Sequence, residues 1–174
     1  MRPSPWGVGG VQGRPALRGG LVCDPAGRGA PPRRKDTALP EGWSLDGRRF
    51  LVAEDNAINS EILCEILQMF GAGSVVKEDG LQAVRAFGES APGTYDAILM
   101  DIRMPEMNGY EATRAIRTME RPDAATIPIV AMTANAFDED VRKSIEAGMN
   151  AHVAKPIDVE ALRSTLDRLL NASE

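Results

Sequence analysis

Histidine and cysteine are scarce in this chain of 174 residues, which contains one histidine, His152, and two cysteines, Cys23 and Cys64. Two cysteines cannot provide the disulfide framework of a small secreted domain, so we expect a reduced, cytoplasmic setting. The scarcity also argues against a zinc site, because thiolates and imidazoles are the usual zinc ligands. The sequence has no apolar run long enough to span a membrane and no apolar core of a secretory signal.

Basic residues are in the minority, and the net charge is −5. Residues 1–47 contain more basic than acidic side chains, so the rest of the chain is more acidic than the whole. An acidic domain argues against a nucleic-acid-binding face. Residues 1–47 also hold ten of the 17 glycines and seven of the 12 prolines, with almost no apolar periodicity. This composition predicts a disordered arm or linker, followed by one domain at residues 48–172.

From residue 48 onward, short apolar segments alternate with amphipathic ones. The alternation predicts strands at 48–53, 74–77, 97–100, 128–132 and 151–154, and helices at 57–69, 80–87, 110–119, 138–147 and 159–169. Five such strand–helix units predict an α/β fold with a parallel sheet and helices on both faces. The strand order that fits five strands is the flavodoxin-like, doubly wound order 2-1-3-4-5.

Polar side chains stand at the carboxyl ends of four predicted strands. Glu54 and Asp55 follow the first strand, Asp101 ends the third, Thr133 follows the fourth and Lys155 follows the fifth. In the order 2-1-3-4-5 these four strands are neighbours, so we expect the side chains to converge.

Each of these residues also has an ordinary structural explanation when it is taken alone. Glu54 and Asp55 could cap the first helix, Thr133 could be a strand-end hydroxyl, and Lys155 could be a solvated surface lysine. Asp101 differs, because an acid that ends a buried strand has no routine structural role. The convergence on adjacent strands therefore favours a functional site.

The predicted site has the composition of a phosphoryl-transfer centre. Three neighbouring carboxylates repel one another unless a cation joins them, and all-oxygen ligands select a hard cation such as Mg²⁺. A metal-bound carboxylate can act as a nucleophile on a phosphoryl group and form an aspartyl phosphate. Thr133 could then donate a hydrogen bond to one phosphoryl oxygen, and Lys155 could pair with another.

Four motifs occur in the order that is typical of one family. They are Leu51-Val-Ala-Glu54-Asp55-Asn56, Met100-Asp101-Ile-Arg-Met-Pro105-Glu-Met-Asn-Gly109, Ala131-Met-Thr133-Ala134 and Lys155-Pro156. Together, over about residues 48–170, they resemble the receiver domain of response regulators in two-component and phosphorelay systems. The Glu-Asp pair, where most of the family has Asp-Asp, resembles the C-terminal receivers of hybrid histidine kinases.

The resemblance implies a role for each acid. Asp101 would accept a phosphoryl group from a phosphohistidine on a histidine kinase or a histidine phosphotransfer protein. Asp55, Asp101 and the backbone carbonyl of Arg103 would ligate Mg²⁺ directly, and Glu54 would act on the metal through water. The domain would assist its own phosphorylation and dephosphorylation without being a turnover enzyme.

The resemblance also implies how the phosphoryl group is held and sensed. Thr133 and Lys155 would hold its oxygens, and Ala134 would leave room for it. The aromatic switch position of the family corresponds to His152, which would rotate inward when Thr133 moves, although a half-buried strand histidine is the alternative. A cis Lys155–Pro156 bond is expected.

Several alternatives stay open at this point. The chain could be a stand-alone receiver or a piece of a hybrid kinase, and the face of the fourth helix, fifth strand and fifth helix could form a homodimer. A receiver-fold scaffold that acts without phosphorylation would keep the same motifs. A Mg²⁺-dependent phosphatase of the haloacid-dehalogenase type would need a second acid at the position of Arg103. A flavodoxin would need a phosphate-binding loop where Glu54 and Asp55 stand. The sequence does not indicate a downstream effector.

Overall fold

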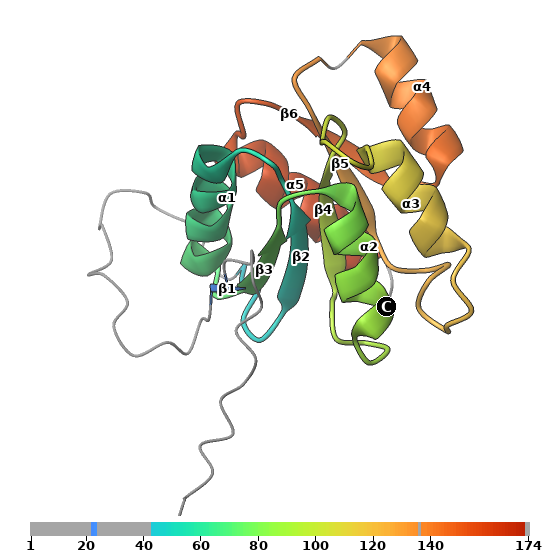
Figure 1. The fold of residues 1–174 in the computed structure, drawn as a ribbon. Coiled ribbons are helices and arrows are strands. Elements are labelled where there is room, and N and C mark those ends of the chain that lie inside the picture. Colours follow the sequence, from blue (N-terminus) through green and yellow to red (C-terminus); the bar gives the residue numbers. More distant parts are fainter. Residues whose placement is uncertain (1–21, 24–42, 136, 173–174) are drawn as a thin grey trace, which may run out of the picture.

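A parallel sheet lies at the centre of the computed structural model, which describes residues 22–23, 43–135 and 137–172 (Figure 1). Its strands are β2 (Arg49–Ala53), β3 (Gly73–Lys77), β4 (Ala97–Asp101), β5 (Ile129–Thr133) and β6 (Ala151–Ala154). They pair in the order β3-β2-β4-β5-β6, which confirms the predicted order 2-1-3-4-5. All residues of β4 and β5 are buried, as expected for central strands covered on both faces.

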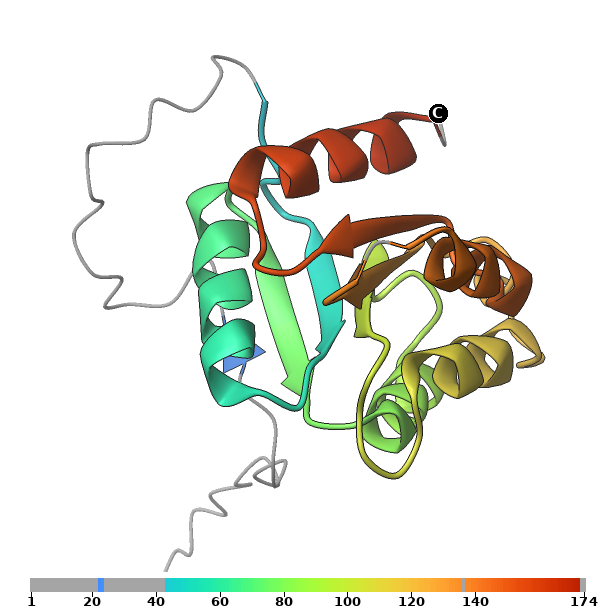
Figure 2. The same ribbon diagram turned by 90° about the horizontal axis from the view of Figure 1, so that it is seen from above.

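Five helices cover the sheet, as predicted: α1 (Ala57–Met69), α2 (Gly80–Glu89), α3 (Gly109–Arg117), α4 (Asp138–Ala147) and α5 (Val159–Asn171). Helices α1 and α5 lie on one face, and α2 and α3 lie on the other, with α4 beside α3 (Figures 1 and 2). None of the helices in the described ranges has the length and apolar content that crossing a membrane requires.

Alternate strand residues fill two apolar layers, one on each face of the sheet. Phe50 and Val52 of β2 pack with α1 and α5, whereas Leu51 and Ala53 pack with α2 and α3. This period-2 alternation is what turns successive side chains of a strand to opposite faces. The same alternation determines toward which face of the sheet the side chains at the carboxyl end of the strand point.

A short sixth strand, β1 (Val22–Cys23), pairs antiparallel with β3. It lies within residues 1–47, where the sequence predicts a disordered arm. Strand β3 is the edge of the parallel part of the sheet, and an edge offers unpaired backbone groups to any nearby segment. The prediction for residues 1–21 and 24–42 concerns a part of the chain outside the described residues.

Packing contacts of the domain are already made before residue 48, where the sequence predicts the domain to begin. The indole of Trp43 meets the ring of Phe70 edge-on at a centroid distance of 4.7 Å, and its Nε1 donates a hydrogen bond to Asp167 Oδ1 at 2.9 Å. Leu45 is 2% exposed, and its backbone N–H donates to the carbonyl of Phe70. Trp43 and Leu45 thus fasten the end of α1 to α5. Two isolated apolar residues in a Gly- and Pro-rich stretch give no periodicity that would reveal this.

Candidate functional site

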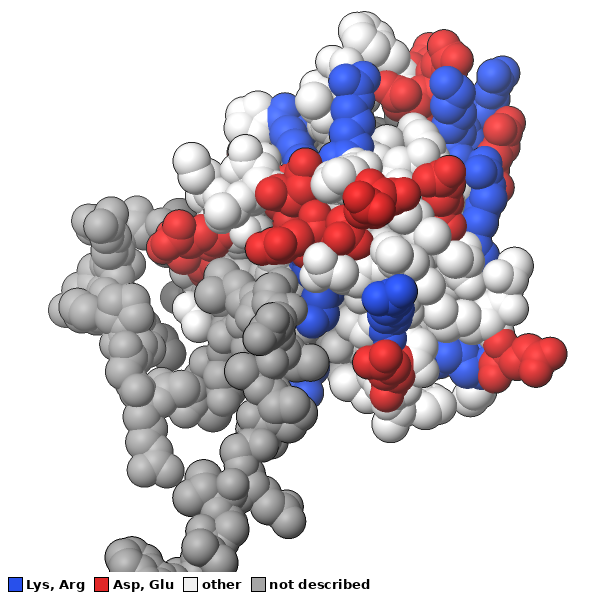
Figure 3. Space-filling model, in the orientation of Figure 1, with Lys and Arg blue, Asp and Glu red and all other residues white. Residues whose placement is uncertain are grey.

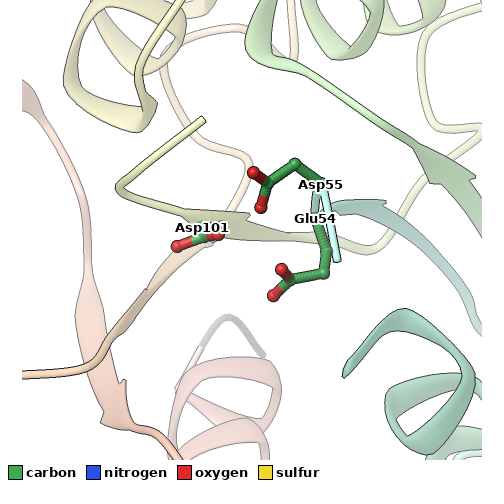
Figure 4. Close-up of side chains that lie close together, drawn as sticks. All are labelled: Glu54, Asp55 and Asp101. Atoms are coloured by element: carbon green, nitrogen blue, oxygen red, sulfur yellow. The ribbon is translucent and has the colours of Figure 1, made fainter. Parts of the chain in front are cut away.

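Three acids meet where β2 and β4 end, as the strand order predicts. Glu54 and Asp55 follow β2, Asp101 ends β4, and the pairing of Ala53 with Met100 brings these positions side by side. Each acid offers a carboxylate oxygen, and these oxygens lie within 4.8 Å of one another (Figure 4). Asp55 is exposed, whereas Glu54 and Asp101 are buried. The site is therefore open to solvent on the side of Asp55.

The ammonium group of Lys155 lies between the two buried acids. Its Nζ is 2.7 Å from Glu54 Oε2 and 3.1 Å from Asp101 Oδ2. Backbone N–H groups hold the other carboxylate oxygens, because Asn56 donates to Glu54 Oε1 at 3.1 Å and Arg103 donates to Asp101 Oδ1 at 3.2 Å. The Lys155–Pro156 peptide bond that follows is cis, as the resemblance implies.

Burial and a neighbouring carboxylate disfavour the charged form of Asp101. Burial and the nearby charge of Glu54 raise the pKa of Asp101 to about 6, although Lys155 and the Arg103 N–H act in the opposite direction. Burial alone would lower the pKa of Lys155, but its hydrogen bonds with Glu54 and Asp101 raise it, so this ammonium stays charged at neutral pH. One ammonium does not balance three carboxylates, and a further cation would relieve the repulsion.

The donor set suits a hard divalent cation. The cluster offers carboxylate oxygens and no thiolate or imidazole, a combination that favours Mg²⁺ over zinc. Further exposed acids, Glu78 and Glu106, stand in the loops after β3 and β4, and Figure 3 shows acidic side chains gathered across this face of the molecule. Their negative potential would attract a cation to the site. The predicted roles of Glu54 through water and of the Arg103 carbonyl stay predictions.

The structure places the remaining predicted residues around this cluster. Thr133 is 7% exposed, and its hydroxyl donates to the carbonyl of Asn135 at 2.8 Å and accepts from the Asn135 N–H at 3.1 Å. The hydroxyl therefore bonds to its own loop. Ala134 is exposed beside it. His152 is exposed on β6, and its role as the switch stays a prediction.

Two glycines let the loop after Asp101 close tightly against the site. A Cβ atom at Gly109 would lie 2.4 Å from the carbonyl oxygen of Asp101, and one at Gly80 would lie 2.3 Å from that of Met107. Gly109 belongs to one of the predicted motifs but has no predicted role of its own, and Gly80 is not among the residues predicted for the site. The sequence does mark Gly109 as the first residue of α3, because Asn108 before it and Glu111 after it form a capping box.

A cavity of about 520 Å³ opens beside Asp55. Asp55, Arg103 and Met104 line it on the side of the site, and Tyr110 and Asp140 line it toward α4. The Arg103 side chain, which lines the cavity, is exposed. A reacting group of modest size can therefore approach the site at Asp55 from this side.

Comparison with known families and proteins gives a consistent result. The family model described as response regulator receiver domain matches residues 50–167. Hybrid signal transduction histidine kinase I of Dictyostelium discoideum is 39% identical over 128 residues, which are 72% of this chain and 7% of that protein. The peroxide stress-activated histidine kinase mak1 of Schizosaccharomyces pombe is 34% identical over 154 residues, 87% of this chain and 9% of that protein. The chain thus spans only a small part of these curated relatives.

Two solved structures are similar over most of the described domain. One is the receiver domain of a sensor histidine kinase from Pseudomonas aeruginosa PAO1, with a magnesium ion coordinated in its active site cleft; it is 39% identical, with a TM-score of 0.65 over 72% of this chain and 98% of that one. The other is the receiver domain of the Saccharomyces cerevisiae response regulator Ssk1 in complex with the histidine phosphotransfer protein Ypd1. It is 30% identical, with a TM-score of 0.66 over 72% of this chain and 90% of that one.

Proposed function

Because the chain belongs to the response regulator receiver domain family of two-component phosphorelay systems, we propose that its Asp101 accepts a phosphoryl group from a phosphohistidine donor. The observation that carries this proposal is the cluster of Glu54, Asp55 and Asp101, with Lys155 placed between two of the acids. The receiver domain with a bound magnesium ion supports Mg²⁺ as the cation. Asp55, Asp101 and the Arg103 carbonyl would hold it directly, and Glu54 through water.

Bound there, Mg²⁺ would neutralise the acids and stabilise charge on the transferring phosphoryl oxygens. The Asp101 carboxylate attacks phosphorus, the phosphorus–nitrogen bond of the donor breaks, and its electron pair leaves with the imidazole. Lys155, 3.1 Å from Asp101 Oδ2, pairs with a phosphoryl oxygen. Thr133 donates its hydroxyl proton to another oxygen, and the small side chain of Ala134 leaves room for the group. In this way the domain assists its own phosphorylation and, with water as the attacking group, its dephosphorylation.

The donor surface that we propose lies on α1, next to the acids. Ile58 and Ile62 are 68% and 44% exposed, although apolar side chains of this size are usually buried. They lie one helical turn apart, so they share a face of α1. The complex of Ypd1 with the Ssk1 receiver domain supports a histidine phosphotransfer protein as the donor. An apolar patch beside Asp55 would dock such a protein with its phosphohistidine above Asp101.

A homodimer through α4, β6 and α5 is the second interface that we propose. Phe137, just before α4, and Ile145 on α4 are 70% and 66% exposed, and His152 on β6 is exposed as well. Rotation of His152 inward would change the shape of this face after phosphorylation and so link the site to assembly. Light scattering of the phosphorylated and unphosphorylated chain would test this interface.

The proposal is tested by transfer from a phosphorylated histidine phosphotransfer protein such as Ypd1, in the presence of Mg²⁺. We expect the label to move to the wild-type chain and not to Asp101→Asn. The variant Ile58→Asp should lose transfer from the protein donor but keep phosphorylation by acetyl phosphate, because only the protein donor needs the α1 surface. Transfer to Asp101→Asn at the wild-type rate would contradict the proposal.

A further inference from the structure

Helix α4 begins differently from the other helices of the described chain. The side chains of Asn56, Asp79, Asn108 and Asp158 accept backbone N–H groups at the starts of α1, α2, α3 and α5. Helix α4 starts after Phe137, whose phenyl ring has no acceptor and is 70% exposed. A missing side-chain cap typically costs about 1 kcal/mol of helix stability. The first turn of α4 therefore lacks the side-chain hydrogen bond that the other helices have, although the charges of Asp138, Glu139 and Asp140 suit the helix dipole there.

The opposite end of α4 is firmly held. Gly148 ends the helix with φ +103°, and the N–H groups of Gly148 and Met149 donate to the carbonyls of Ile145 and Ser144. From α3, Arg117 Nε donates to the carbonyl of Gly148 at 3.0 Å, and its other nitrogens bond to Ala124 and Asn150. A cation at this end also suits the helix dipole.

Burial of the side chains of α4 also differs between the two halves of the helix. Among the described residues of α4, the buried ones are Ser144 and Ala147, which both lie in the second half. The first half is contacted by Tyr110, whose hydroxyl donates to the carbonyl of Asp140 at a long 3.5 Å. The ion pair of Glu139 with Lys143 is exposed on both sides and adds little. A turn without buried side chains can open at a small free-energy cost.

The uncapped turn follows shortly after the phosphoryl site. The hydroxyl of Thr133 has one proton, which it donates to the carbonyl of Asn135, just before the start of α4. If Thr133 donates this proton to a phosphoryl oxygen, as the proposed function requires, the Asn135 carbonyl loses it. The chain that leads into α4 is then less restrained. The Thr133 hydroxyl has a single proton, so its bond to the phosphoryl oxygen and its bond to the Asn135 carbonyl exclude each other. Phosphorylation and the release of this part of the chain are therefore coupled.

We propose that residues 138–141, the first turn of α4, unwind and rewind as a unit while the second half of the helix stays fixed. We further propose that phosphorylation of Asp101 shifts this equilibrium toward the unwound turn; this second part rests on the proposed function. The output face would then change by local melting of one helical turn next to Phe137, with Gly148 and Arg117 as the fixed end.

Amide hydrogen exchange of the full chain tests the first part. The amides of residues 141–143 bond to carbonyls of the first turn, whereas those of 147–149 bond to the second half, so the former should exchange faster. Phe137→Asn supplies a cap and should slow exchange at 141–143 by about fivefold. Phe137→Ala removes the ring without adding a cap and is the matched control. Equal exchange along the helix, or equal slowing by both variants, would overturn the proposal.

The second part is tested on the same chain after acetyl phosphate and Mg²⁺, with intact mass recording phosphorylation. We expect faster exchange at 141–143 in the phosphorylated wild type, less of this effect in Phe137→Asn, and no change at 147–149. Thr133→Val removes the hydroxyl with little change in shape and should speed exchange at 141–143 without any phosphoryl group. A phosphorylated chain with unchanged exchange would overturn this part and leave the proposed function standing. A chain that no donor phosphorylates would instead overturn the proposed function together with this part.

Discussion

At the residue scale, Asp101 carries its charge in surroundings that disfavour it. It is 5% exposed and lies beside Glu54, and its pKa of about 6 is above the ordinary value of 3.8. Between these two pH values, the folded chain binds more protons than the unfolded chain. Stability from this group is therefore present at low pH and is lost as the pH rises through the window. A bound cation would relieve the repulsion between the carboxylates of Asp101 and Glu54.

The first prediction concerns this pH dependence. Without metal, we expect wild type to lose about 2–3 kcal/mol of unfolding free energy from Asp101 between pH 4 and pH 7. Asp101→Asn cannot ionise at this position, so it should lack that loss and be the more stable chain at pH 7. Urea denaturation of both chains across this pH range, with EDTA present, measures the difference. Parallel pH profiles of the two chains would show that folding does not raise the pKa of Asp101.

The second prediction concerns Lys155. Replacing it by Met removes the ammonium between Glu54 and Asp101, and we expect metal-free stability at pH 7 to fall by about 1–3 kcal/mol. Mg²⁺ should bind more tightly, because the ammonium competes with the metal for the same oxygens, while phosphorylation of Asp101 should decline. Calorimetric titration with Mg²⁺ measures the affinity. Lys143→Met on exposed α4 is the control and should change neither quantity; weaker Mg²⁺ binding in Lys155→Met would count against the competition.

At the element scale, the loop after β4 depends on close backbone contacts. The start of α2 touches this loop at Gly80, where a Cβ atom would lie 2.3 Å from the carbonyl oxygen of Met107. At Gly88, near the end of the same helix, a Cβ atom would meet only the flexible side chain of Met119, at 3.4 Å or more. A side chain is therefore excluded by backbone at Gly80 but can be accommodated at Gly88.

The third prediction uses this pair of glycines. Gly80→Ala should destabilise the chain by about 1–3 kcal/mol, because backbone must shift to make room. Gly88→Ala should instead stabilise it by about 0.5–1 kcal/mol through helix propensity. Thermal unfolding of the two variants gives both signs. Destabilisation of the same size in both would mean that crowding at Met107 is not the cause.

The fourth prediction concerns the segment before β2. Trp43→Ala removes the contact with Phe70 and the hydrogen bond to Asp167, and we expect a loss of about 1–3 kcal/mol of unfolding free energy. Trp43→Phe keeps an aromatic ring but has no N–H to donate, so an intermediate loss is expected. Chemical denaturation of the full chain measures both values. Wild-type stability in Trp43→Ala would show that the packed unit does begin at residue 48.

At the scale of the whole molecule, the sequence predicts the repeated strand–helix units and the residues that the strand order places at adjacent strand ends. Buried parallel strands read as apolar runs, so the five strand–helix units could be found, and the strand order then brought Glu54, Asp101 and Lys155 together. Contacts between distant segments leave no such signal, and the pairing of Trp43 with Asp167 is an example. The choice of hydrogen-bond partner by Thr133 could not be predicted either, because it depends on side-chain geometry.

The central claim, that Asp101 is the phosphoryl acceptor of a Mg²⁺-dependent site, is tested most directly by intact mass spectrometry after incubation with acetyl phosphate. Wild type, Asp101→Asn and the surface control Glu120→Gln are compared with Mg²⁺ and with EDTA. We predict a gain of one phosphoryl group in wild type and Glu120→Gln with Mg²⁺ only, and no gain in Asp101→Asn. An equal gain in Asp101→Asn, or no gain in folded wild type with either acetyl phosphate or a phosphohistidine protein, would contradict the account.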